Sequence, residues 1–293
     1  MRVLIVTNML PTPATPTEGV FIGEQIDSLR NRGLDVDVVH VERTQQGMRS
    51  YTALPRHLRR AVANGAPEVV HATYGGLLAY LTERATPSIP FVVSFCGSDL
   101  QGEPTSPPLP RATAQVGVLA SRRVARRADE IVVKTSSLAM HLPTTVPQER
   151  VHVIPNGVST ERFRPLDRED CRARLGWSGP GPHVMLAGQP RPIKRPELAR
   201  RAVELLRTDL EGAELHIPDG VSRDDMPRWL NASDAVVLTS RHEGSPTSSR
   251  RRWRVELRSS RCPSATCPSG SGTCRTVGSS ARRRPRSPGA CDR

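Results

Sequence analysis

Three stretches decide the fold class: VLIVT at residues 3–7, VFIGEQIDSLRNR at 20–32 and DVDVVHV at 35–41. The first and third are short runs rich in Val and Ile, which is typical of strands buried on both faces. The middle stretch has the apolar spacing of a helix, and Gly33 is well placed to end it. A strand, a helix and a second strand in this order predict a parallel βαβ unit.

The same alternation continues to about residue 247 and predicts an α/β fold with two doubly wound, Rossmann-like parallel sheets. Further strands are expected at 68–72, 91–95, 130–134, 151–155, 183–187, 213–217 and 235–239, and further helices at 75–84, 113–128, 196–206 and 224–231. Turn and loop composition interrupts the pattern between the two sheets. We therefore expect a first domain at 1–155, an interdomain link at 156–182, a partial second domain at 183–247 and a tail at 248–293.

The positive charge of the chain is concentrated in the tail. Residues 248–293 contain twelve arginines and two acidic residues, Glu256 and Asp292. Their net charge is therefore +10, out of +13 for the whole chain. Three aliphatic residues in that segment cannot bury enough apolar surface to order it, so we expect it to be disordered. Its four cysteines are not spaced like paired zinc ligands, and no metal site is expected.

Several functional classes are excluded by what the sequence lacks. The chain contains no run of about 18–20 apolar residues that could span a bilayer. Its first residues have no apolar signal-peptide segment, so a cytoplasmic location is expected. A dinucleotide-binding Gly-x-Gly-x-x-Gly after the first strand, a P-loop and a Ser nucleophile elbow are all missing.

The residues after successive strands are the ones that bind ligands in such sheets, because they share one edge. The stretches concerned are Glu18-Gly19, His71-Ala-Thr-Tyr-Gly-Gly76, Cys96-Gly-Ser-Asp99, Gly188-Gln-Pro-Arg-Pro-Ile-Lys194 and Arg241-His-Glu-Gly-Ser-Pro246. They indicate a cleft for a phosphorylated ligand, in which Lys194 and Arg191 would face a pyrophosphate and Glu243 would accept hydrogen bonds from sugar hydroxyls. Taken singly, each Lys, Arg or His could be a solvated loop residue and each Gly a turn residue. Their recurrence at successive strand ends favours the joint interpretation.

Several motifs resemble a known family. Val153-Ile-Pro-Asn-Gly-Val158 followed by Arg162-Phe-Arg-Pro165 is similar to a signature of family 4 glycosyltransferases, which have the GT-B fold. Gly188 and Lys194 resemble the family's donor-phosphate loop, and His242-Glu-Gly-Ser-Pro246 resembles the start of its Glu-x7-Glu motif. Val6-Thr-Asn-Met, Gly19-Val-Phe, Glu24-Gln25 and Cys96-Gly-Ser-Asp99 are similar to the teichuronic-acid-type branch, which builds cell-surface polysaccharide.

The resemblance implies retaining, metal-independent transfer of a hexosyl group from a UDP- or GDP-linked sugar, with no cofactor. Catalytic roles would fall to Lys194, which neutralises the diphosphate, and to Glu243, which holds a sugar hydroxyl. Donor binding would involve Gly19, Gly188, Arg191, Lys194, Glu243, Gly244, Ser245, Pro246 and Thr247. The acceptor side would include His71, Tyr74 and Asp99. The acceptor would be a glycan or a lipid-linked glycan, with peripheral contact at the inner membrane face and no specific nucleic-acid partner.

One departure from the family pattern concerns the second Glu of Glu-x7-Glu. That position is Arg251, and a guanidinium cannot accept hydrogen bonds from ribose hydroxyls. The segment from Ser248 onward can be encoded by codons that, when read one nucleotide earlier, spell VVKEALACGVAVVSVPVGDVPERVGDL. That sequence resembles the family's continuation after this point. We therefore expect the segment after Thr247 to be an out-of-frame translation, with the second domain truncated and activity impaired.

Two alternatives come from other functional classes. The chain could be a non-catalytic relic that binds nucleotide sugars, which donor binding without turnover would identify. It could instead bind anionic polymers through the Arg-rich tail, although Trp253 is the only aromatic residue there.

Overall fold

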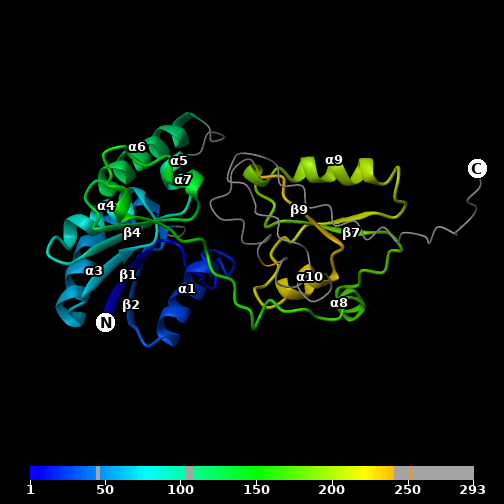
Figure 1. Ribbon diagram of the computed structural model, residues 1–293, viewed down its shortest axis with the longest axis horizontal. Coiled ribbons are helices and arrows are strands. Elements are labelled where there is room, and N and C mark those ends of the chain that lie inside the picture. Colours follow the sequence, from blue (N-terminus) through cyan, green and yellow to red (C-terminus); the bar gives the residue numbers. More distant parts are fainter. Residues whose placement is uncertain (44–46, 103–107, 241–250, 252–293) are drawn as a thin grey trace, which may run out of the picture.

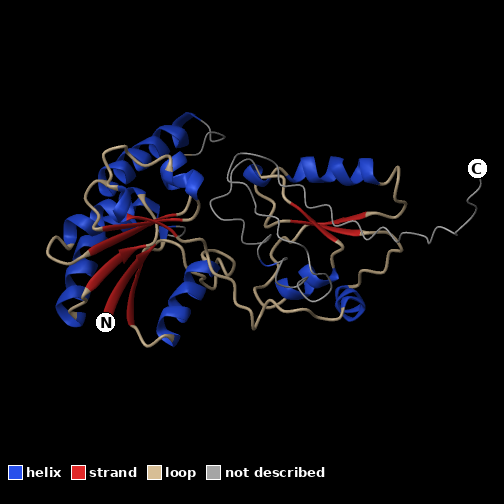
Figure 2. Cartoon of the chain, viewed as in Figure 1, coloured by secondary structure: helices blue, strands red, loops and turns tan. Residues whose placement is uncertain are grey.

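The computed structural model describes residues 1–43, 47–102, 108–240 and 251, with the side chains of 108–113 left aside. The described part contains two parallel sheets, each covered by helices on both faces (Figures 1 and 2). The tail expected at 248–293 lies outside the described residues, Arg251 excepted.

The first sheet has six strands in the order β2-β1-β3-β4-β5-β6. All neighbouring strands run parallel, with Val3 opposite Val36 on one side and Val69 on the other. The strands are β1 (Arg2–Thr7), β2 (Asp35–His40), β3 (Val69–Ala72), β4 (Phe91–Phe95), β5 (Glu130–Val133) and β6 (Val151–Val153). The order places the carboxyl ends of all six strands along one edge.

Alternate side chains of β1 enter two separate cores. Val3 and Ile5 pack with Ile22 and Ile26 of helix α1 (Val20–Asn31), whereas Leu4 and Val6 belong to the larger core on the opposite face. The helices α3 (Ser50–Gly65), α4 (Gly76–Ala85) and α6 (Pro108–Ala125) contribute to that opposite side, where α4 packs against both α3 and α6. Short helices α5 (Ser98–Gln101) and α7 (Ser136–Ala139) follow β4 and β5. Single-turn helices lie at η1 (Gly47–Arg49) and η2 (Gln148–Arg150).

The second sheet has the strand order β8-β7-β9 within the described residues. Its strands are β7 (His183–Leu186), β8 (Glu214–His216) and β9 (Ala235–Val237). Val184 packs toward Val203 of α9 (Pro196–Leu206), and Met185 packs on the other face with Leu230 of α10 (Met226–Ala232). Figure 1 shows α9 and α10 on opposite sides of this sheet. The single-turn helix η3 (Pro192–Lys194) precedes α9.

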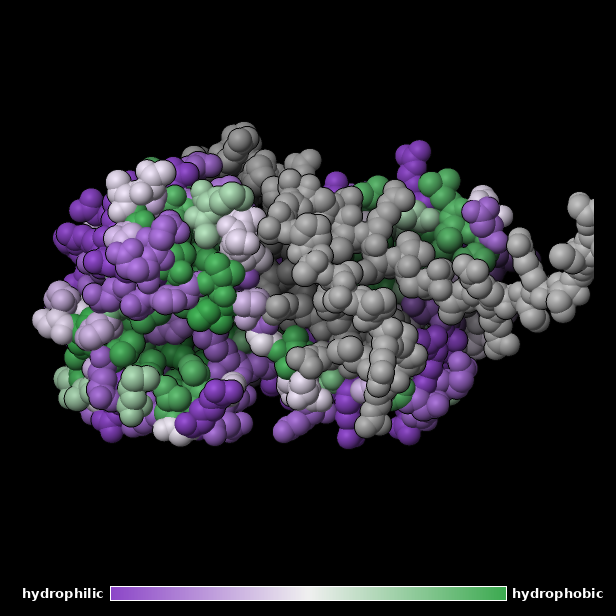
Figure 3. All heavy atoms as spheres, in the orientation of Figure 1, coloured by the Kyte–Doolittle hydropathy of each residue, from purple (hydrophilic) through white to green (hydrophobic). Residues whose placement is uncertain are grey.

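The segment between the sheets contains a helix that the sequence analysis does not anticipate. Helix α8 (Arg168–Leu175) packs against α10, and Phe163, only 1% exposed, joins the core of Met185 and Leu230. The segment expected as a link, 156–182, therefore supplies packing to the second sheet. On the viewed face of Figure 3, hydrophilic side chains cover much of the described surface around the first sheet, with hydrophobic residues between them.

Candidate functional site

Gly19 ends the loop that follows β1 and begins helix α1. Its φ of 65° lies in the left-handed region, and a Cβ there would collide with the backbone carbonyl of Met9. The residue is therefore required by its own backbone geometry and by the close approach of the returning loop. This combination places the amino end of α1 beside the carboxyl end of β1.

Gly188 and Lys194 lie against each other after β7, as the sequence predicts for a single loop. Gly188 has a φ of +89°, and a Cβ on it would lie 3.5 Å from Cε and 3.6 Å from Nζ of Lys194. The loop is fixed to the end of β9, because Thr239 donates from its hydroxyl to the carbonyl of Lys194 at 2.5 Å and Arg195 donates to the carbonyl of Thr239 at 2.6 Å. Arg191 lies in the same loop and is exposed.

The loops after β1 and β7 meet across the two sheets. The side-chain amide of Gln189 donates a hydrogen bond of 2.7 Å to the hydroxyl of Thr17. Both residues lie close to positions expected to bind phosphate. Gln189 directly follows Gly188, and Thr17 lies two residues before Gly19. The structure thus brings together two of the predicted loops from opposite domains.

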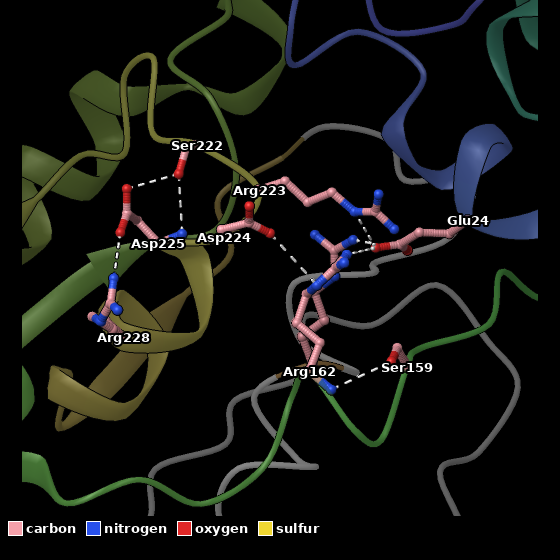
Figure 4. A network of polar contacts seen from close by, with 9 residues as sticks. Glu24, Ser159, Arg162, Ser222, Arg223, Asp224, Asp225 and Arg228 are labelled. Atoms are coloured by element: carbon pink, nitrogen blue, oxygen red, sulfur yellow. Dashed lines mark hydrogen bonds and ion pairs between the residues drawn. The ribbon is translucent and has the colours of Figure 1, made fainter. Parts of the chain in front are cut away.

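A second contact between the two halves centres on Glu24 of α1 (Figure 4). Its Oε1 accepts hydrogen bonds from Arg162 at 3.1 Å and from Arg223 at 3.2 Å, and its Oε2 accepts one from Arg251 at 3.3 Å. The carboxylate is 12% exposed, so it is largely shielded from water. Among these contacts one negative charge faces three positive charges, which leaves the cluster with an excess of positive charge.

Further residues contact the arginines around Glu24. Asp224 lies 3.8 Å from Nε of Arg162 but is largely exposed, so it offsets little of the charge. The guanidinium of Arg251 lies over the ring of Phe163, 4.6 Å from its centroid, and its buried Nε has no hydrogen-bond partner among the described residues. Burial lowers the pKa of Arg251, and Glu24 opposes that shift. Arg251 is thereby held by Glu24 and Phe163.

No individual role for Glu24, Arg162 or Arg223 follows from the sequence alone. Glu24 and Arg162 stand in the motifs quoted for the family resemblance, which was the available signal. Their meeting depends on a contact between residues 138 positions apart, which no local pattern reveals.

Asp99, expected on the acceptor side, organises two loops. Its Oδ1 accepts from the backbone N–H groups of Cys96 at 3.0 Å and Gly97 at 2.8 Å, and its Oδ2 accepts from Gly75 at 2.9 Å. Burial raises the pKa of Asp99, and these backbone hydrogen bonds oppose the increase. With 4% exposure, the side chain acts by positioning the loops after β3 and β4.

His71 and Tyr74 lie near the same edge. Nε2 of His71 is 2.8 Å from the Ser94 hydroxyl, and burial, with the nearby charge of Lys134, lowers the pKa of His71 to about 4. The hydroxyl of Tyr74 is 2.9 Å from that of Ser98, and burial raises the pKa of this phenol well above its usual range. His71 and Tyr74 therefore remain neutral near pH 7.

Lys134 is a residue of this region that the sequence analysis does not single out. It follows β5 and is 3% exposed, and burial lowers its pKa while Cys96 and Asp99 oppose that shift. Burial also raises the pKa of the Cys96 thiol to about 12, so this thiol is protonated near neutral pH.

The remaining predicted donor residues, Glu243, Gly244, Ser245, Pro246 and Thr247, lie outside the described residues.

In the part of the chain that the structure describes, no helix is long and apolar enough to cross a membrane.

Comparison with known proteins assigns the family. Residues 1–157, more than half of the chain, match the model of the glycosyl transferase 4-like domain. The chain belongs to this family. The expected family 4 assignment is therefore confirmed at that level.

Curated relatives of this glycosyl transferase 4-like chain carry related names. D-inositol 3-phosphate glycosyltransferase 1 of Catenulispora acidiphila is 33% identical over 178 residues, covering 55% of this chain and 41% of the relative. The D-inositol 3-phosphate glycosyltransferase of Nocardia farcinica is 35% identical over 94 residues, covering 31% and 21%. The chain thus spans less than half the length of these relatives.

Solved structures confirm the GT-B-type fold. Sucrose-phosphate synthase from Thermosynechococcus elongatus matches with a TM-score of 0.63 at 12% identity, covering 83% of this chain and 77% of that one. Anabaena HepE in complex with UDP and glucose matches with a TM-score of 0.56 at 14% identity, covering 87% and 78%. At these identities the likeness concerns the fold.

Proposed function

We propose that this glycosyl transferase 4-like chain binds a nucleotide diphosphate sugar between its two sheets and is built for hexosyl transfer to a glycan or lipid-linked acceptor. The observation that carries the proposal is the hydrogen bond between Gln189 and Thr17, because it joins the Gly188–Lys194 loop to the loop that ends at Gly19. A diphosphate at this junction would meet a cation and glycine backbone from one side and the start of a helix from the other.

Lys194 would carry the main electrostatic role. Negative charge develops on the diphosphate as the bond to the sugar breaks, and a fixed ammonium stabilises that transition state more than the ground state. Gly188 lets the backbone approach the same phosphates, and exposed Arg191 can add charge once a donor is bound. Glu243 would hold a sugar hydroxyl, with residues 244–247 along the sugar and phosphate. A cation in this position would stabilise the leaving diphosphate without a metal ion. Retention at the sugar carbon belongs to the proposal because the resemblance to family 4 glycosyltransferases implies it.

The acceptor would bind against the first sheet, near His71, Tyr74 and the loops held by Asp99. His71 and Tyr74 are neutral near pH 7 and carry groups that can form hydrogen bonds, so they suit the hydroxyls of a sugar. Synthesis of cell-surface polysaccharide, with a cytoplasmic enzyme in peripheral contact with the inner membrane face, is the biological setting that we propose. The names of the curated relatives add inositol 3-phosphate to the acceptors worth testing.

A binding protein without turnover is the second candidate, and Arg251 favours it. This side chain stands where the family places a ribose-binding carboxylate, and it is engaged by Glu24 and Phe163. In this candidate the chain keeps the phosphate-binding loops and lacks the group that orients the nucleoside.

The test measures binding and turnover separately. Calorimetric titration of the full chain with UDP, GDP and their glucose and mannose derivatives is followed by assays for nucleoside diphosphate release with and without acceptors. Lys194→Ala should weaken diphosphate binding by about tenfold or more, since a charge-assisted contact is lost. Arg200→Ala, which removes an exposed cation from α9, should bind like the parent. Equal affinities in both variants would overturn the assigned phosphate site, and binding without release would select the second candidate.

A further inference from the structure

The amino-terminal edge of the second sheet brings two histidines and a glutamate together. His183 begins β7, and Glu214 and His216 are the first and third residues of β8. In the parallel register His183 lies opposite Glu214, and Met185 lies opposite His216. Because side chains two residues apart share one face of a strand, all three project from the same face of the sheet.

Their ligand atoms form a compact triangle. Nδ1 of His183 is 2.9 Å from Nε2 of His216, and Oε2 of Glu214 lies 3.7 Å from the first atom and 3.6 Å from the second. A point equidistant from three atoms so separated is about 2.0 Å from each, which is the usual length of a zinc–nitrogen or zinc–carboxylate bond. The spacing therefore fits one metal ion without displacement of the strands.

The surroundings hold each of the three groups in place. The indole of Trp177 stacks on His216, with ring centroids 3.5 Å apart and planes within 10°. The backbone of His183 is paired with Asp234, whose Oδ2 accepts the N–H of His183 at 2.8 Å. Glu214 lies against Gly179, where a Cβ would collide with its Oε1.

Two features bear on the charge and protonation of the cluster. The buried Nε2 of His183 has no hydrogen-bond partner among the described residues. To bind one metal ion, Nδ1 of His183 and Nε2 of His216 must both carry lone pairs. The proton of His183 then lies on Nε2, and the proton of His216 lies on Nδ1. Arg172 adds unfavourable positive charge nearby, but it is paired with Asp234 at 2.6 Å.

We propose that His183, Glu214 and His216 bind one divalent transition-metal ion, with zinc as the favoured occupant. Two imidazoles and one carboxylate suit zinc, cobalt, nickel or copper, whereas magnesium and calcium prefer oxygen ligands alone. Water would complete the coordination on the side where Glu214 is 43% exposed. The ion would tie β7 to β8 and hold the Trp177 loop against them.

This site is separate from the proposed donor site. His183 stands at the start of β7, whereas Gly188 follows its end, so these two residues lie at opposite ends of the strand. Among the described residues, this is the one group of His, Cys, Asp and Glu side chains whose ligand atoms lie close enough to share an ion. Metal-independent sugar transfer and a metal site here are compatible.

The test uses the full chain, freed of metal with a chelator and with its accessible thiols alkylated so that exposed cysteines do not bind the probe. Zinc chloride is titrated by calorimetry, and cobalt chloride by its visible absorption, which reports coordination geometry. The parent should bind one ion at this site, and its melting temperature should rise with zinc. His216→Gln and Glu214→Gln should weaken binding by about tenfold or more and lose the thermal shift.

Two further variants separate a specific site from binding to any histidine and from loss of folding. His152→Gln removes a histidine paired with Glu130 at 2.6 Å on the first sheet, and its zinc affinity should equal that of the parent. Gly179→Ala should displace only the Glu214 carboxylate, so it should weaken metal binding even if a histidine variant fails to fold. If zinc binds His216→Gln, Gly179→Ala and the parent equally, or none of them, His183 and His216 form only a hydrogen bond with each other and the proposal is wrong.

Discussion

Gln189 and Thr17 are 172 residues apart in the chain, and their side chains form a hydrogen bond of 2.7 Å that joins the loops after β7 and β1. The contact lies next to Gly188 in one loop and two residues before Gly19 in the other. Thr239 holds the loop after β7 through its hydrogen bond to the Lys194 carbonyl. In the loop after β1, Gly19 packs closely against the backbone of Met9. This polar pair and the Glu24 cluster both connect the first sheet to the second half of the chain, next to the two loops that we propose to bind phosphate.

We expect Thr17 and Gln189 to be energetically coupled. In a double-mutant cycle with Thr17→Val and Gln189→Leu, urea unfolding should give a coupling free energy of about 1 kcal/mol, typical of a partly buried hydrogen bond. Thr17→Val combined with Thr208→Val, whose hydroxyl bonds locally to the Leu205 carbonyl, should be additive. Additivity in the first pair would show that the two loops do not hold each other.

Glu24→Gln should destabilise the chain, because it leaves three guanidinium groups without their shared carboxylate. Breaking a largely buried ion pair costs about 3 kcal/mol, measured here as a lower free energy of unfolding. Pyrophosphate should stabilise this variant more than the parent, since an added anion can replace the lost charge. Glu197→Gln, on the exposed face of α9, is the matched control and should change neither quantity. A Glu24→Gln variant as stable as the parent would contradict the role assigned to the cluster.

The stability of the chain should fall as the pH decreases from about 6.5 to about 4, partly because of His71. The folded chain holds this ring neutral with a pKa of about 4, whereas the unfolded chain takes up a proton near the ordinary value of 6.5. Acid therefore favours the unfolded state across that interval, by up to about 3 kcal/mol for this residue.

The check is urea unfolding of the parent and of His71→Gln at several pH values. The variant should lose part of the pH slope, whatever its stability at pH 7. His57→Gln, on the exposed side of α3, should keep the slope of the parent. Equal slopes in His71→Gln and the parent would rule out a buried neutral His71.

All nine expected strands occur close to their predicted positions, because each is a compact apolar run between turn residues. The helices that the sequence analysis missed have weaker patterns. In α8 Cys171 is the one buried residue, so apolar periodicity gives no signal, although Asp167 caps the helix by accepting from the Asp170 N–H at 2.8 Å. In α3 the buried residues Tyr51, Leu54 and Leu58 do have helical spacing, but Pro55 and several arginines obscure it.

The part of the candidate site that the sequence can indicate is the loop that contains both Gly188 and Lys194. Gly188 and Lys194 lie within one loop of seven residues, so their contact is local in the sequence. The convergence of Arg162, Arg223 and Arg251 on Glu24 depends on how the two sheets are placed, which local propensity does not encode. The same reason explains why His183 and His216, which are 33 residues apart, were not recognised as a pair.

Arg251 provides the last prediction, which concerns the gene. The side chain stands eight positions after Glu243, and its guanidinium is held by Glu24 and Phe163. If the segment from Ser248 onward is read out of frame, independent sequencing across the codons for Glu243 to Val255 should reveal a one-nucleotide shift. The corrected frame should encode VVKEALACGVAVVSVPVGDVPERVGDL, which places a carboxylate at this position. A chain carrying the corrected segment should then bind nucleoside diphosphates more tightly, because a carboxylate accepts the ribose hydrogen bonds that Arg251 cannot. A confirmed frame would make Arg251 a genuine feature, and binding without turnover would then be the favoured function.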